Sequence, residues 1–182
     1  MAKTITDIRF LIEAGIKPDS LEDDVVLNWC NEVNMDVGVN INIPAEPQII
    51  TLNTSTLAYD LNEDVKIINR LRLQSDIDAG DDISININYR IYNGQIIIPN
   101  VFWVAPDDLV VDYYKHMTYF DAMTDTIDIP DRFTPLYTFY GIKQFKSDKP
   151  EYEARYQAMK DQVVSYYLLG NEPDVVESRW RG

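Results

Sequence analysis

IPDRFTPLYTFYGIKQFKSDKPEYEARYQAMKDQVVSYY, residues 129–167, decides the fold of this chain because it reads as two successive amphipathic helices. In the first helix, Thr134 is suited to cap the N-terminus, and Pro135 fits the first turn, where its missing amide hydrogen costs little. The apolar face of this helix comprises Phe133, Leu136, Tyr137 and Tyr140. A helix with one such face must pack against another element.

The second helix repeats this arrangement. Asp148 is suited to cap it, with Lys149 and Pro150 in the first turn, and Ser147 marks the break from the first helix. Large side chains then recur at spacings of four, three, four and four, which is the helical period. They are Tyr152, Tyr156, Met159, Val163 and Tyr167. The sequence therefore predicts two helices docked through aromatic stripes.

The N-terminal residues 1–39 predict a helical hairpin. Thr4 and Asp7 have the spacing of a capping box, and Gly15 is suited to end the first helix. A second box at residues 20–23 opens a longer helix that ends at Gly38. Its predicted buried residues fall four apart: Leu21, Val25, Trp29, Val33 and Val37.

Residues 47–120 change to strand patterns. The clearest strand is Ile83–Tyr92, where apolar and polar residues alternate, and Asn93–Gly94 then predicts a type I′ hairpin turn. The other predicted strands are Gln48–Leu52, Thr56–Leu61, Val65–Leu73, Gln95–Ile98 and Leu109–Thr118. They would form an antiparallel meander or a small sandwich.

These patterns predict an α+β fold, in which a helical bundle carries an inserted β-rich segment. We expect residues 1–169 to form a single domain, comprising the hairpin at 1–39, the β-rich insertion at 47–120 and the helix pair at 131–169. Residues 170–182 have too little apolar content to pack as an independent unit, so they are predicted to be a flexible tail.

The chain has 182 residues and a net charge of −14, with its acids in small clusters. This acidity argues against a protein that grips nucleic-acid phosphates, and by itself it most often means solubility. No apolar run has the length of a membrane span, and the first residues lack the apolar core of a secretory signal. The sequence thus predicts a protein made and kept in a cytoplasm.

Candidate catalytic groups are few. His116 is the single histidine and lies in a predicted strand, without a nucleophile motif elsewhere. Cys30 is the single cysteine and falls in an apolar helical pattern, which is typical of a buried structural residue. A hydrolase with an unidentified pair of carboxylates stays a minor alternative. The interpretation is that the chain is not an enzyme.

Cofactor and metal signals are equally weak. The glycines are scattered, so neither a dinucleotide fingerprint nor a phosphate loop can be drawn. Four acids surround Gly80 and could ligate calcium, namely Asp76, Asp78, Asp81 and Asp82. Their spacing departs from the twelve-residue calcium loop, so a solvated turn is the favoured interpretation. We predict no metal and no cofactor.

The C-terminal residues Arg179, Trp180 and Arg181 are the clearest candidates for a binding site. Trp and Arg often dominate binding energy, and this Trp has no local core to bury it. The alternative is that these residues belong to a disordered end or to a cloning remnant.

Four segments together resemble the head-to-tail adaptor, or connector, proteins of bacteriophages. The entry Ile129–Phe133 and the helix pattern of Tyr152, Tyr156 and Met159 are similar to their C-terminal helix pair. The hairpin return Gln95–Pro99 is similar to theirs, and Asn28–Glu32 matches the centre of their second helix loosely. The resemblance covers order and local pattern over most of the chain, and it includes no catalytic signature.

The resemblance implies a structural virion protein at the neck, assembled in the host cytoplasm. Its partners would be a portal protein, tail or nozzle and stopper proteins, and copies of itself in a dodecameric ring. DNA would pass through the acidic channel without specific binding, and Arg179, Trp180 and Arg181 would contact the portal. The alternative from another class is a non-viral mixed α/β binding or scaffold module.

Overall fold

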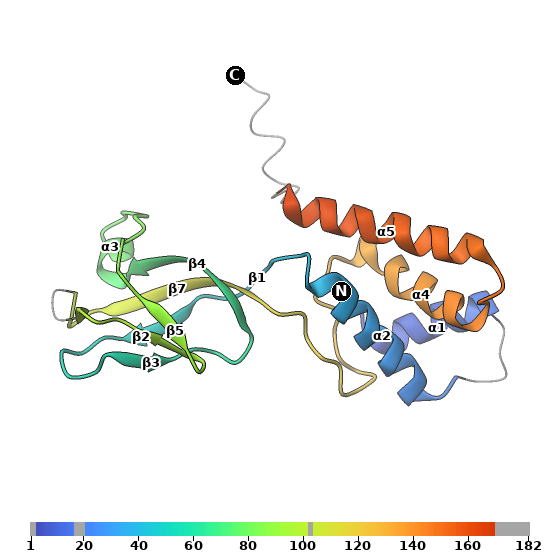
Figure 1. The fold of residues 1–182 in the computed structure, drawn as a ribbon, viewed down its shortest axis with the longest axis horizontal. Helices are drawn as coiled ribbons and strands as arrows, with labels where there is room; N and C mark the ends of the chain where they lie inside the picture. The colour runs from blue at the N-terminus through green and yellow to red at the C-terminus, as the bar shows by residue number, and fades with distance from the viewer. Residues whose placement is uncertain (1–2, 17–20, 102–103, 170–182) are drawn as a thin grey trace, which may run out of the picture. The chain divides into compact units, whose positions relative to one another are not determined.

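The computed structural model describes residues 3–16, 21–101 and 104–169. The fold is α+β, as predicted, with helices and antiparallel sheets (Figure 1). The chain divides into two compact units. The helical unit comprises the described parts of Met1–Ile43 and Met117–Gly182, and the β-rich unit spans Pro44–His116. The sequence had predicted one domain with the β-rich segment at 47–120.

In the helical unit, one central helix packs against the others (Figure 1). This helix is α4 (Pro135–Phe145), and it contacts α1, α2 and α5. The flanking elements are α1 (Ile5–Ile16), α2 (Asp23–Gly38), the short 3-10 helix η2 (Asp131–Phe133) and α5 (Pro150–Leu168).

Helix α1 begins with the predicted capping box. The Thr4 amide donates to the Asp7 carboxylate at 2.9 Å, and the Asp7 amide donates back to the Thr4 hydroxyl at 3.4 Å. The prediction that Gly15 ends the helix is wrong, because α1 continues to Ile16. A Cβ on Gly15 would stand 2.5 Å from the Ile142 Cδ1 atom, so close packing of α4 accounts for this glycine.

Helix α2 ends at Gly38, as predicted, and its buried face agrees with the predicted one only in part. Leu21, Val33 and Val37 are buried, as predicted. Val25 and Trp29 are only half-buried, and Val26 and Cys30 take their places in the core. Asn31 and Asn34 are also buried, since their amides donate to the backbone carbonyls of Phe120 and Thr118 at 3.0 and 2.7 Å. Ser20, in the predicted second box, lies outside the described residues.

The prolines of α4 and α5 occupy the first turns, as predicted. Thr134 holds the N-cap position of α4, as predicted, but its side chain makes no capping hydrogen bond, and the predicted cap of α5 is wrong. The Thr134 hydroxyl donates to the Asp131 carbonyl at 2.6 Å, which closes the preceding η2 turn. Lys149 holds the N-cap position of α5, so Asp148 lies one residue too early to cap it.

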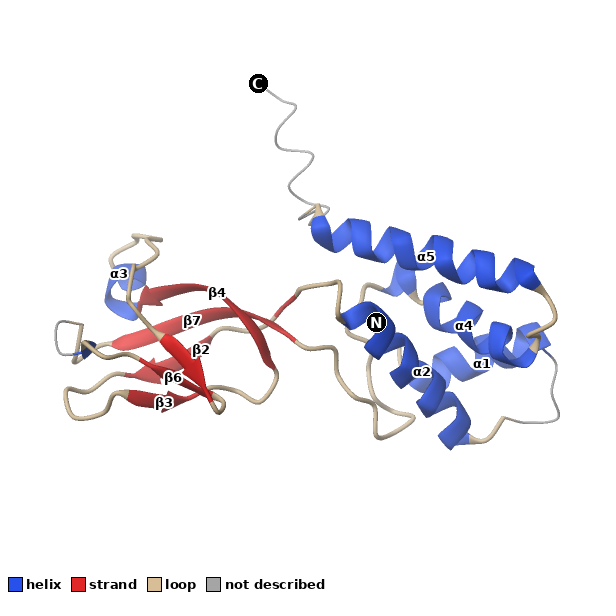
Figure 2. Cartoon of the chain, viewed as in Figure 1, coloured by secondary structure: helices blue, strands red, loops and turns tan. Residues whose placement is uncertain are grey.

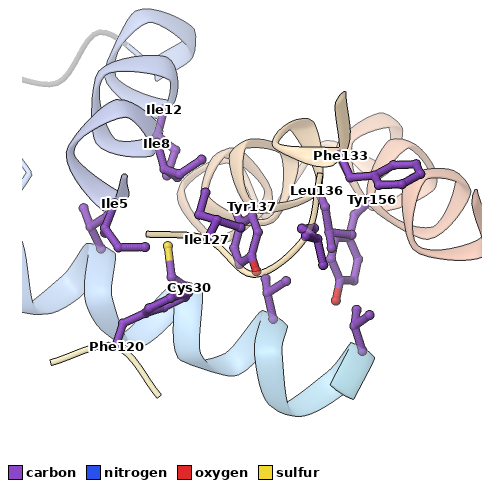
Figure 3. Packing of buried hydrophobic residues seen from close by; sticks show 14 of the residues in the cluster. Ile5, Ile8, Ile12, Cys30, Phe120, Ile127, Phe133, Leu136, Tyr137 and Tyr156 are labelled. Carbon is purple, nitrogen blue, oxygen red and sulfur yellow. The ribbon is translucent and has the colours of Figure 1, made fainter. Parts of the chain in front are cut away.

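The aromatic stripes of α4 and α5 form the core with α1 and α2 (Figure 3). Tyr137 and Tyr156 are both about 1% exposed, and Val163 is fully buried. Tyr152, Met159 and Tyr167 pack half-buried against this core. Figure 3 shows side chains from α1, α2, α4 and α5 converging, with Phe120 and Ile127 supplied by the connecting segment.

The β-rich unit contains two sheets (Figure 2). In the larger sheet, β7 (Asp108–Lys115) pairs antiparallel with β2 (Gln48–Thr51) and with β4 (Val65–Leu73), and β1 (Ile43–Pro44) also joins it. The smaller sheet has the order β3-β6-β5. These strands are β3 (Ala58–Asp60), β6 (Gln95–Ile97) and β5 (Arg90–Tyr92), and the short helix α3 (Gln74–Asp78) follows β4.

Both sheets contribute to one hydrophobic core. Leu109 and Val111 of β7 are fully buried and meet Ile96 of β6 in the same cluster. Gln48 also joins the sheets, because its side chain donates to the Asp60 carbonyl at 2.9 Å and accepts the Asn62 amide at 2.9 Å. The β2 and β3 ends of the two sheets are therefore linked by hydrogen bonds.

The predicted strand Ile83–Tyr92 is mostly wrong, since only Arg90–Tyr92 pairs as β5. Its partner β6 is three residues long, so residues 83–89 have no counterpart in that sheet. The Ile85 amide instead donates to the Leu71 carbonyl at 2.8 Å. The predicted turn is confirmed, because Asn93 and Gly94 have φ values of 50° and 73°.

Candidate interaction surfaces

The tyrosines of α4 and α5 point mainly into the helical unit. The rings of Tyr140 and Tyr156 meet edge to face with centroids 5.1 Å apart. The Lys143 ammonium lies 4.8 Å from the centroid of each ring, which adds a cation–π contact. These side chains hold α4 and α5 together and are not free for an external partner.

Hydroxyl groups of the same tyrosines connect to acids on α2. The Tyr156 hydroxyl donates to Asp36 at 2.5 Å, and Lys160 donates to the same carboxylate at 2.6 Å. Burial opposes the charged form of Asp36, but the hydrogen bonds from Lys160 and Tyr156 lower its pKa below the ordinary value. Asp36 therefore ties α2 to α5 through two donors.

Tyr140 bonds to a second acid on α2, Glu32. Its hydroxyl donates to Glu32 at 2.8 Å. Burial, followed by this hydrogen bond to the carboxylate, raises the pKa of Tyr140 to about 12. Burial also raises the pKa of Tyr156 and of Tyr137 above the ordinary tyrosine value. Neutral phenols are thus built into this core, which suits structure and not proton transfer at neutral pH.

The segment Ile129–Phe133, which carries part of the family resemblance, is anchored to α5. The Arg132 guanidinium lies 4.4 Å from the Tyr166 ring centroid and 4.8 Å from that of Phe133. The Phe133 and Tyr166 rings are themselves 5.3 Å apart. This three-residue stack fixes the entry to α4 against the C-terminal half of α5.

A shallow polar cleft of about 300 Å³ lies beside α2. Asn31 forms part of its wall and holds the adjoining segment, because it donates to the Phe120 carbonyl and accepts the Phe120 amide at 2.8 Å. The remaining lining residues are Asp24, Leu27, Asn28, Tyr119, Phe120 and Asp121. The polar groups of Asn31 are satisfied internally, so they offer little to a ligand.

The acidic turn at residues 76–82 has a structural role that its composition did not reveal. Asp82 accepts from Arg70 and Arg72, each at 3.1 Å, and Asp112 on β7 accepts from the same two arginines at 2.7 Å. In the part of the chain that the structure describes, no group of His, Cys, Asp or Glu is arranged to hold a metal ion. Arg70 and Arg72 alternate along β4 with a period of two, which is the signal that could have identified them.

The candidate nucleophile and base lie in different units. Cys30 is 1% exposed, and burial raises the pKa of its thiol to about 12. His116 is exposed and lies one residue beyond β7, where its amide donates to the Asp64 carbonyl at 2.8 Å. Neither residue has the surroundings expected of an activated catalytic group.

Exposed large hydrophobic side chains mark the free surfaces of the helical unit. On α1, Phe10 is 65% exposed and Leu11 is 44% exposed, and Ala14 follows Phe10 by one turn. The other exposed residues of this unit include Met35, Val39, Tyr119, Phe145, Leu168 and Leu169. We call Phe10, Leu11 and Ala14 the α1 outer face.

The β-rich unit also exposes apolar side chains, on both of its sheets and beside them. These are Ile49, Leu57, Ile67, Ile83, Tyr89, Ile91 and Tyr92. Single exposed hydrophobic residues are ordinary, but clusters of them indicate sites of protein contact. The predicted portal-binding residues Arg179, Trp180 and Arg181, together with the predicted tail 170–182, lie outside the described residues.

No protein-family model matches this sequence, and no curated protein matches it. Among the described helices, none combines the length and apolarity needed to cross a bilayer.

Proposed function

We propose that this chain is a structural virion protein, a head-to-tail adaptor subunit that assembles into a ring between the portal and the tail. The observation that carries the proposal is the exposure of large hydrophobic residues at separate places on the helical unit. The α1 outer face is one such place, while Met35 on α2 and Leu168 at the end of α5 are 69% and 71% exposed. A ring subunit requires two different patches that meet head to tail.

The charge of the chain supports the same proposal. A net charge of −14 would line a ring with acids and repel the phosphates of passing DNA. Such a channel would let the duplex slide without sticking, whereas a basic lumen would hold it.

Several polar groups in the described interior are engaged in internal contacts, which supports a structural role. The tyrosine hydroxyls of α4 and α5 are bonded to acids, the thiol is buried, and the arginines of β4 are paired. Contact with tail, nozzle or stopper proteins would use further surfaces of the same subunit. Contact with the portal is proposed for Arg179, Trp180 and Arg181 on the sequence alone.

The test uses the full chain and the portal protein encoded in the same genome. The two are mixed and imaged by electron microscopy, and ring-shaped particles stacked on the portal axis are expected. Trp180→Ala should weaken co-sedimentation with portal-bearing capsids, and Tyr119→Ala serves as a surface control. Monomers that neither form rings nor bind the portal would overturn the adaptor proposal, whereas rings that bind equally well with Trp180→Ala would overturn only the portal contact.

A further inference from the structure

Strand β5 ends the smaller sheet, so one of its edges has no strand beside it among the described residues. All three of its residues, Arg90, Ile91 and Tyr92, are exposed, with Ile91 at 52% and Tyr92 at 65%. An exposed apolar edge strand is a template for pairing with another chain.

The hydrogen bonds of the hairpin fix which backbone groups face this open edge. The Ile98 amide donates to the Leu57 carbonyl, and the Leu61 amide donates to the Gly94 carbonyl, both at 2.8 Å. Even-numbered residues of the β6 strand and its flanks therefore turn toward β3, and Gln95 and Ile97 turn toward β5.

The partners of Gln95 and Ile97 are Tyr92 and Arg90. These two residues of β5 direct their backbone groups at β6. By alternation, the N–H and C=O groups of Ile91 are directed at the open edge.

The charge pattern around β5 is unusual for this chain. Residues 83–98 contain a single charged side chain, Arg90, although the whole chain carries a net charge of −14. Two copies would repel each other over most of their surfaces, but this stretch contains no carboxylate. Strands β5 and β6 therefore bring no carboxylate of their own to a contact with a second copy; the nearby Asp60 on β3 accepts from the Gln95 side chain at 2.7 Å.

We propose that β5 pairs antiparallel with β5 of a second copy of this chain, about a twofold axis at Ile91. The two Ile91 residues would exchange their outward N–H and C=O groups as a hydrogen-bonded pair. Each Arg90 would then lie opposite Tyr92 of the other copy, where a cation–π contact is available. The two smaller sheets would join into one sheet of order β3-β6-β5-β5-β6-β3.

The neighbouring register centred on Arg90 is less favourable. Centring the pair on Arg90 would set two arginines directly opposite each other, which is destabilising. It would also direct the outward groups of Ile91 at Tyr89, which lies outside the strand. Because the strand is short, the contact is small, and the association is expected to be weak and dependent on concentration.

This inference does not rest on the proposed function. A twofold contact closes after two copies, whereas a ring contact is head to tail, so the two interfaces are separate properties. The surface also lies in the β-rich unit, while the proposed ring contacts lie on the helical unit.

The test is sedimentation velocity of the isolated full chain from about 10 µM to about 1 mM, the range in which small interfaces associate. The native chain should shift from monomer toward dimer, and Ile91→Lys should weaken this self-association at least tenfold. Leu57→Lys is the matched control, because Leu57 is 48% exposed and directly precedes β3, at the opposite edge of the same sheet from β5. That variant should associate like the native chain.

Amide hydrogen exchange provides a readout that requires no variant. Protection of the Ile91 amide should increase with protein concentration, while the Tyr92 amide, already directed at β6, should change little. A monomer at every concentration, a dimer unaffected by Ile91→Lys, or an Ile91 amide whose exchange ignores concentration would each overturn the twofold pairing. None of these results would bear on ring formation with the portal.

Discussion

Gly141 on α4 faces Ile12 on α1 at such close range that a Cβ on the glycine would stand 2.4 Å from the Ile12 Cδ1 atom. The same Cβ would lie 2.9 Å from Cγ1 of Ile12 and 3.2 Å from the Trp29 ring on α2. Gly15 on α1 faces Ile142 on α4 in the reverse sense, since a Cβ on Gly15 would stand 2.5 Å from the Ile142 Cδ1 atom. The two helices therefore cross through a reciprocal pair of glycine and isoleucine contacts.

Gly141→Ala should destabilise the protein by about 1–3 kcal/mol, because the methyl group overpacks a crossing that is closed on two sides. The gain in helix propensity, about 1 kcal/mol, is opposed by the clash with Ile12 and Trp29. Chemical denaturation monitored by circular dichroism measures this difference. Gly38→Ala is the control, since its Cβ would stand 3.3 Å from Cγ of the flexible Met117. Equal stabilities of the two variants would contradict this account of Gly141.

Arg72→Ala should cost more stability than Arg70→Ala, although both arginines bind the same two carboxylates. The Arg72 side chain is 14% exposed and that of its partner Asp112 is 15% exposed, so the truncation leaves a largely desolvated carboxylate short of a donor. Arg70 is 36% exposed, and water can replace much of what it provides. We expect a loss of about 1–3 kcal/mol for Arg72 and less than about 1 kcal/mol for Arg70. Thermal unfolding of the two variants side by side would contradict this ranking if Arg70→Ala melted lower.

Alkaline pH should destabilise the helical unit through its tyrosines. Burial and Glu32 raise the folded-state pKa of Tyr140 to about 12, above the ordinary value of 10.0. An acid whose pKa is raised by folding contributes stability that is complete below the unfolded pKa and is lost as the pH rises through the folded pKa. The free energy of unfolding should therefore decrease between about pH 10 and pH 12.

Tyr140→Phe removes one of the protons that create this dependence, so its stability should fall less steeply in the same pH window. Urea denaturation at a series of pH values, together with tyrosinate absorbance, measures both effects. Tyr92→Phe provides the control, because Tyr92 is 65% exposed. If the two variants and the native chain shared one slope, the raised pKa of Tyr140 would be contradicted.

Sequence periodicity predicted the elements whose signal lies in their own residues. The Asn93–Gly94 turn, the strand Val65–Leu73 and the stripe on α5 all follow from local rules about backbone conformation and helical spacing. The predicted strand over residues 83–89 was wrong because a strand also needs a partner strand. The partner β6 is only three residues long, and the alternation within residues 83–89 carries no information about that length.

The buried face of α2 was predicted only in part, for a related reason. Asn31 and Asn34 face the core because the carbonyl groups of Phe120 and Thr118, more than 80 residues away, accept their amides. A prediction from the local hydrophobic pattern assigns such polar residues to the exposed face. Among the candidate surfaces, the arginine pair could have been predicted, because Arg70 and Arg72 alternate along β4. The exposure of Phe10 could not be predicted, because it depends on which side of α1 the other helices cover.

Phe10→Glu should prevent ring assembly while leaving the subunit folded. Phe10 is 65% exposed on the α1 outer face, so a carboxylate there meets water in the free chain, and the free energy of unfolding should change by no more than about 0.5 kcal/mol. In a ring contact the same carboxylate would be desolvated against an acidic neighbour, which costs several kcal/mol.

Tyr119→Glu is the matched control, because Tyr119 has the same 65% exposure in the same unit. Electron microscopy with the portal should reveal rings for the native chain and for Tyr119→Glu, but only unassembled subunits for Phe10→Glu. Normal rings from a correctly folded Phe10→Glu protein would remove the α1 outer face from the ring interface, and the contact would then have to be sought around Met35 and Leu168.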